Sequence, residues 1–241
     1  MTKLITAIAL PSLLATLAVG CVDDNDSDMP SETSGGHLAK YAADPFGAVP
    51  TFRPSTCQDI VDYVPTAKDG EYTLYIHNEP TYRWLVYCAN MQQGTPAEYL
   101  TLQYGENSST FASASGQVTT QYDKVRINPQ SLSVDIGDKT FAVSTGSAMH
   151  NGVKLTSMPY GVAMSCGVVA KANINLRGTP FRLERQLPWF GTYSAPTNEL
   201  STDRKVNDMT MNGDCGWFAA TELTKPTSTD SQYKLNLAFF R

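Results

Sequence analysis

The residues that could carry chemistry in this sequence are three histidines, five cysteines and a scatter of acids. A catalytic zinc site needs closely grouped ligands, for example two histidines four residues apart with a glutamate between them. The histidines are His37, His77 and His150, and none stands in such a motif. A zinc site made of His77, His150 and one carboxylate is therefore a hypothesis that depends wholly on how the chain folds.

A second candidate metal site is a calcium site in residues 201–216, which read STDRKVNDMTMNGDCG. Calcium prefers carboxylate and amide oxygens supplied by a loop. The oxygen-bearing side chains here are Asp203, Asn207, Asp208, Asn212 and Asp214. Because Arg204 and Lys205 dilute the negative charge, a plain polar loop is the alternative interpretation.

Other catalytic patterns are weak. Ser147 lies near His150, but a catalytic triad is defined by geometry, and no Gly-x-Ser-x-Gly motif is present. Asp135 and Asp138 flank a predicted turn. Carboxylates solvated at a turn are a simpler interpretation than a catalytic pair of the kind that glycosidases use. The sequence thus favours a protein that is not an enzyme. The net charge of −5 argues against nucleic acid as a partner.

The N-terminus has the pattern of an export signal. Lys3 precedes an apolar run over residues 4–19, which Pro11 interrupts and which is short for a membrane-spanning helix. The run ends in LAVGC, which resembles a bacterial lipobox. We therefore predict that residues 1–20 are a lipoprotein signal peptide and that Cys21 is lipidated, since two or three acyl chains anchor a protein firmly. An ordinary signal peptide cleaved nearby is the alternative.

An acidic segment follows. Residues 22–36 hold five acids and no base, and they offer little to bury. We predict a disordered tether over residues 21–52. Val22 after the cysteine favours the outer membrane or the cell surface of a bacterial envelope.

The cysteine count fits export. If Cys21 is lipidated, four cysteines are left, and an even number in an oxidising compartment predicts two disulfides. Four cysteines allow three pairings, and the count alone leaves all three open. The four are Cys57, Cys88, Cys166 and Cys215.

The elements that must position these residues are mainly strands. Apolar residues alternate in short bursts between turn residues, which predicts a single mainly β domain over residues 53–241. The predicted turns lie at residues 68–70, 128–129, 136–138 and 178–180. One short helix is expected over residues 57–64, with Thr56 as its N-cap. We expect the aromatic side chains to lie in the sheet core rather than to act as stacking platforms for sugars. Residues 201–213 are expected to form a long loop. Strands are expected over residues 71–77, 84–88, 98–102, 124–127, 132–136, 140–144, 161–164, 173–176, 215–219 and 234–240.

Eight segments together resemble one known family, the GON domain, first defined at the C-terminus of some ADAMTS metalloproteases and also encoded in secreted bacterial proteins. They cover nearly all of residues 55–241 in the family's order. The segments are DGEYTLYI (69–76), WLVYCANM (84–91), GTPAEYLTL (94–102), YDKVRINP (122–129), DIGDKTFAVSTG (135–146), SMPYGVAMSC (157–166), ANINLRGTPF (172–181) and DCGWF (214–218).

The resemblance implies a compact β-rich domain stabilised by disulfides. Its opening also resembles that of fibrinogen-type domains, in which two cysteines pair around a hairpin. This implies a Cys57–Cys88 disulfide and leaves Cys166 to pair with Cys215. Zinc binding and metalloendopeptidase activity are properties of the parent proteases that contain this domain. The resemblance links them to this chain only through the family, because the protease domain is not in this sequence.

Three hypotheses for function follow. The first is a lipid-anchored, non-catalytic module that recognises a protein or a glycan outside the cytoplasm. The second is a zinc-dependent activity associated with metalloendopeptidases, and the third is a structural envelope protein. No cofactor is firmly expected; zinc at His77 and His150, or calcium at Asp203, Asp208 and Asp214, are the candidates.

Overall fold

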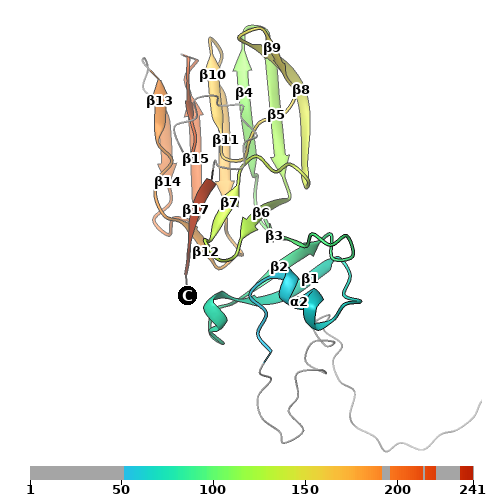
Figure 1. The fold of residues 1–241 in the computed structure, drawn as a ribbon. Helices are drawn as coiled ribbons and strands as arrows, with labels where there is room; N and C mark the ends of the chain where they lie inside the picture. The colour runs from blue at the N-terminus through green and yellow to red at the C-terminus, as the bar shows by residue number, and fades with distance from the viewer. Residues whose placement is uncertain (1–51, 192–195, 214, 221–233, 241) are drawn as a thin grey trace, which may run out of the picture. The chain divides into compact units, whose positions relative to one another are not determined.

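The bursts of apolar residues form two β-sheets in the computed structural model, which describes residues 52–191, 196–213, 215–220 and 234–240 (Figure 1). All the described elements belong to one unit of the chain, within Thr33–Arg241. The predicted signal peptide, Cys21, His37 and the tether up to residue 51 lie outside the described residues. No described helix is both long enough and apolar enough to cross a membrane.

The predicted helix is present as α2 (Cys57–Tyr63), and its first turn is capped by side chains. The Thr56 hydroxyl accepts the N–H of Asp59 at 3.1 Å, and the Asp59 carboxylate accepts the N–H of Thr56 at 2.9 Å. These two bonds form a capping box, which satisfies N–H groups that a helix cannot pair internally. The local sequence therefore fixes where the helix begins.

A disulfide and a carboxylate attach this helix to the first sheet. Cys57 is bonded to Cys88, and the Cys57 N–H donates to Glu98 Oε1 at 2.8 Å. Cys88 and Glu98 are direct cross-strand partners. The pairing Cys57–Cys88 is the one implied by the resemblance, and so is the second disulfide, Cys166–Cys215.

The first sheet contains seven strands in the order β1-β2-β3-β6-β7-β17-β12. Its first two strands form the expected hairpin, connected through a 3-10 turn, η1 (Ile76–Asn78). The strands are β1 (Gly70–Tyr75), β2 (Arg83–Ala89), β3 (Ala97–Thr101), β6 (Lys124–Asn128), β7 (Ser133–Asp135), β12 (Phe181–Leu183) and β17 (Lys234–Phe239).

The second sheet contains ten strands, with β13-β16-β10-β4-β11-β15-β14 as its main path. Strands β5, β8 and β9 extend it from β4, as the neighbouring arrows in Figure 1 show. Among its described pairs, β10 with β4 is the parallel one. The strands are β4 (Ser108–Ser113), β5 (Gly116–Tyr122), β8 (Ala142–His150), β9 (Val153–Leu155), β10 (Ala163–Cys166), β11 (Ala170–Asn175), β13 (Trp189–Gly191), β14 (Thr197–Leu200), β15 (Val206–Met211) and β16 (Gly216–Phe218).

The prediction of a long loop over residues 201–213 is wrong, because this segment contains β15. Met209 and Met211 alternate with polar residues and are buried, as in any half-buried strand. The alternation was concealed by Asn207, which is fully buried although polar. Its side-chain oxygen accepts the Leu187 N–H at 3.3 Å, and its amide donates to Asn198.

An aromatic contact brings together the two ends of the first sheet's strand order. Trp84 of β2 packs edge-on against Phe181 of β12, with ring centroids 5.1 Å apart. Tyr82 contacts Phe239 of β17 at 5.5 Å, and Phe239 contacts Phe181 at 5.7 Å. Strands near opposite ends of the sheet order therefore share one part of the core.

The partly buried carboxyl of Glu98 predicts a pH dependence of stability. Burial raises its pKa above the ordinary value, although the bond from the Cys57 N–H acts the other way. A raised folded-state pKa adds stability below the ordinary pKa, and this is lost as pH rises through the folded pKa. We expect wild type to be less stable relative to Glu98→Gln at about pH 7 than at about pH 4.

The measurement is the free energy of unfolding by urea for both chains at each pH. The amide introduced by Glu98→Gln keeps an oxygen that can accept the Cys57 N–H, so the comparison isolates the ionisation. The exposed Glu79→Gln serves as the matched control. A difference between wild type and Glu98→Gln that is the same at both pH values would contradict the assignment.

Candidate functional site

The candidate site is a cleft of about 370 Å³ beside the Trp84–Phe181 contact. One wall comes from β1, β2 and β3, and the other comes from the turn that leads into β12. The lining residues are Glu71, Arg83, Trp84, Leu85, Leu100, Thr101, Gln103, Gly178, Thr179 and Pro180.

The polar groups of the cleft have unused hydrogen-bonding capacity. Thr101 donates its hydroxyl hydrogen to Glu71 Oε1 at 3.2 Å, which leaves further lone pairs on the carboxylate. Arg83 is exposed and has no carboxylate partner among the described residues, where the one ion pair is Arg126–Asp138 at 3.8 Å. Glu71, Arg83 and Gln103 thus offer an acceptor, a forked donor and an amide at one cleft.

Trp84 and Leu85 supply apolar lining of the cleft. Trp84 is only 3% exposed, and its Nε1–H has no acceptor in the described part of the chain. A buried polar group without a partner costs free energy, so such groups are uncommon in folded proteins. Beside it Leu85 is 51% exposed.

The opposite wall is a turn whose geometry requires glycine. Gly178 has φ +80°, and a Cβ there would lie 2.5 Å from the ring of Tyr104 and 2.7 Å from Gln103 Oε1. Thr179 fixes the turn, since its hydroxyl donates to Leu176 O at 2.8 Å and accepts the Phe181 N–H at 3.2 Å. The wall is therefore hydrogen-bonded internally and packed against Tyr104 and Gln103.

A cleft with these properties suits a polar ligand that also has an apolar face. Its volume is in the range of small-ligand sites, and such sites combine apolar walls with a few placed polar groups. Sugars and polar peptide side chains both have this character. No described residue in the cleft is a cysteine or histidine.

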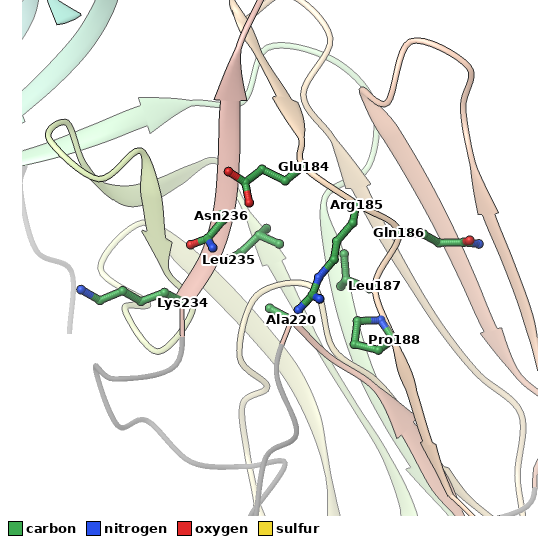
Figure 2. A pocket seen from close by; sticks show the side chains of 9 residues that line it. All are labelled: Glu184, Arg185, Gln186, Leu187, Pro188, Ala220, Lys234, Leu235 and Asn236. Atoms are coloured by element: carbon green, nitrogen blue, oxygen red, sulfur yellow. The ribbon is translucent and has the colours of Figure 1, made fainter. Parts of the chain in front are cut away.

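A smaller cavity, of about 250 Å³, lies between β17 and the segment before β13. Figure 2 shows Arg185, Leu187, Pro188 and Ala220 gathered at its centre, while Gln186 extends away from them. Ala220 and Lys234 border residues 221–233, which are outside the described residues. We assign no ligand to this cavity.

The structure does not bring the two candidate zinc histidines into a ligand cluster. His77 is exposed in η1, and His150 ends β8 with its ring edge-on to Phe111 at 5.5 Å. Burial lowers the pKa of His150. Among the described residues, no three His, Cys, Asp or Glu side chains are grouped so that they could hold a metal.

The candidate calcium ligands are likewise placed on different elements. Asp203 lies in the turn after β14, where bonds from the Ser201 hydroxyl and the Lys205 N–H hold its pKa below the ordinary value. Asp208 lies in β15 and accepts from Asn173. Asp214 is outside the described residues.

Asp138 is also not the solvated turn residue that the sequence suggested. Its carboxylate accepts the Tyr99 hydroxyl at 3.1 Å and the Thr140 N–H at 2.9 Å, in addition to its ion pair with Arg126. Tyr99 in turn packs against Phe141. This group holds the outer face of β3 and β6 in place and is structural.

Sequence reasoning did not select the residues of the cleft. It placed Trp84 on a strand and predicted a turn at Gly178, but nothing in the sequence showed that the two segments meet. Arg83 and Gln103 carried no motif. The useful signal would have been the glycine of the turn, because glycine is favoured where a turn comes close to another part of the chain.

The described chain is thus a two-sheet, mainly β domain with two disulfides and a polar cleft. The GON domain family model matches residues 54–118 and 110–230. The chain belongs to the GON domain family.

One curated relative is the nematode (Caenorhabditis elegans) protein "A disintegrin and metalloproteinase with thrombospondin motifs gon-1". It is 26% identical over 195 residues, which are 68% of this chain but 8% of that protein. The chain therefore matches only a small part of this relative. No solved structure matches it.

The turn at the cleft wall gives a test with a matched control. Gly178→Ala and Gly94→Ala both place a side chain at positive φ, and about 1–2 kcal/mol of strain is expected from that alone. A Cβ at Gly94 meets nothing within 4 Å, whereas one at Gly178 meets Tyr104 and Gln103. Urea unfolding should therefore show a larger loss for Gly178→Ala, and equal losses would mean that the wall is not packed.

Proposed function

We propose that this chain is an exported, lipid-anchored GON-domain module that recognises a glycan or a protein through the cleft between β1–β3 and the turn at residues 178–180. The observation that carries the proposal is the set of polar groups there that keep hydrogen-bonding capacity. Arg83, Glu71 and Gln103 line the same cleft as the exposed Leu85. A ligand with oxygen acceptors would bond to the guanidinium of Arg83 and the amide of Gln103, and its hydroxyl groups would donate to Glu71.

Export and anchoring are supported by separate features. Two disulfides are typical of proteins that fold in an oxidising compartment. The apolar run over residues 4–19, followed closely by Cys21, supports both an export signal and lipidation at Cys21. An outer-membrane or cell-surface address in a bacterial envelope is part of the proposal.

A glycan array is the direct test of the cleft. The full chain should bind a subset of glycans, and Arg83→Ala should weaken that binding by roughly tenfold, the effect of losing about 1.5 kcal/mol of charged hydrogen bonding. Arg185→Ala, at the smaller cavity, is the matched control and should bind as wild type does.

Two outcomes would count against this use of the cleft. One is glycan binding that Arg83→Ala leaves unchanged while Arg185→Ala reduces it. The other is no binding to any glycan together with no shift of tryptophan emission when envelope proteins are added. In either case, a structural envelope role would become the better hypothesis.

The anchor is tested separately by phase partitioning. Wild-type chain extracted from cells should enter the detergent phase of Triton X-114, because several acyl chains bury many methylenes. Cys21→Ser should move to the aqueous phase. Cys21→Ser chain that stays in the detergent phase would show that the membrane attachment does not depend on lipidation.

A further inference from the structure

Strand β8 has one edge that no described strand covers along most of its length. On one side it pairs with β5 from Ala142 to Ser147. On the other side β9 pairs only with residues 148–150 of β8. The segment 142–147 therefore forms an edge of the second sheet among the described residues.

The register identifies the backbone groups that face outward from this edge. The Asp123 N–H donates to Phe141 O at 3.0 Å, and in an antiparallel pair the residues bonded to the neighbour alternate. Val143 and Thr145 therefore bond to β5, while the N–H and C=O groups of Ser144 and the N–H of Gly146 point away from it. Gly146 has φ +75°, so the regular extended alternation ends at this residue. Consistent with this, Ala142 N–H donates to Lys139 O, in the turn before the strand.

This edge lacks charged residues and proline, two of the features that normally prevent strand pairing. Proteins protect edges with charged residues, proline or a covering segment. Residues 141–153 (FAVSTGSAMHNGV) contain no Asp, Glu, Lys, Arg or Pro. The four residues from Val143 to Gly146 are all exposed, and Val143 is 65% exposed.

We propose that this edge pairs with the same edge of a second copy of the chain, so that two antiparallel β8 strands join the two sheets. Ser144 would lie opposite Ser144 of the second copy and exchange two hydrogen bonds with it. The Gly146 N–H of each copy would donate to Ala142 O of the other. This register ends before residue 148 and so avoids β9 in both copies.

The sequence of this edge is suited to pairing with the same segment of a second copy of the chain. In a two-fold antiparallel pair each strand faces its own image, so a charged residue near the centre would be repelled by its copy. The uncharged segment is free of that penalty. The same register sets exposed Val143 against Thr145 of the second copy, and β-branched pairs of this kind favour strand pairing.

The test compares the oligomeric state of three full-length chains, purified in the same non-ionic detergent. Wild type should shift from the mass of one chain to that of two as concentration rises in sedimentation velocity. Thr145→Lys should stay monomeric, because the exposed lysine lies close to its counterpart in the second copy. Thr197→Lys, the same change on the exposed edge strand β14, should dimerise as wild type does.

Amide exchange in the wild type provides a second measurement that needs no variant. Exchange at Ser144 and Gly146 should slow as concentration rises, while exchange at Val143 and Thr145, which already bond to β5, should not change. Wild type that is monomeric at every concentration overturns the proposal, even if the edge accepts an extended segment of another protein. Dimerisation of Thr145→Lys at the wild-type concentration also overturns it.

Discussion

The contact between Trp84 and Phe181 is the constraint on which the cleft depends. The two rings come from strands near opposite ends of one sheet's order, and their packing brings the β1–β2 hairpin to the turn before β12. Replacing a buried aromatic residue with alanine typically costs about 3–5 kcal/mol, so this contact is a substantial part of the stability of a domain of this size. It also explains why a polar cleft and a buried indole lie side by side.

The helix and its cap show where local sequence is sufficient. Thr56 and Asp59 form a capping box across three residues, and no distant partner is needed to start α2. Strands with alternating apolar residues, such as β2, were predictable for the same reason. Strands β4 and β5 were not, because their sequences are rich in Ser, Thr and Gln. Their hydroxyl groups pair across strands, as Thr110 does with Thr119, and these bonds allow polar residues into the sheet.

The cleft could not be predicted because its two walls are nearly a hundred residues apart. A turn at Gly178 and a strand at Trp84 were each expected, but their meeting depends on the strand order of the whole sheet. Buried polar residues add to the difficulty. Asn107 accepts from the Tyr160 hydroxyl at 2.8 Å and from the Asn175 N–H at 2.7 Å, so its burial is stable only in the finished fold. Sequence patterns show local periodicity, but they do not show which distant residues will be hydrogen-bond partners.

The position of β17 has a consequence for the order in which the first sheet forms. This strand, near residue 240, lies between β7 and β12, and it pairs with both. The first sheet therefore cannot be completed until residues 234–239 are available, however early the hairpin and α2 form. Pairings over such long separations form slowly, which keeps the chain open while it is being made. Slow completion of this sheet agrees with the export proposed above, because a membrane translocon threads chains that have not yet folded.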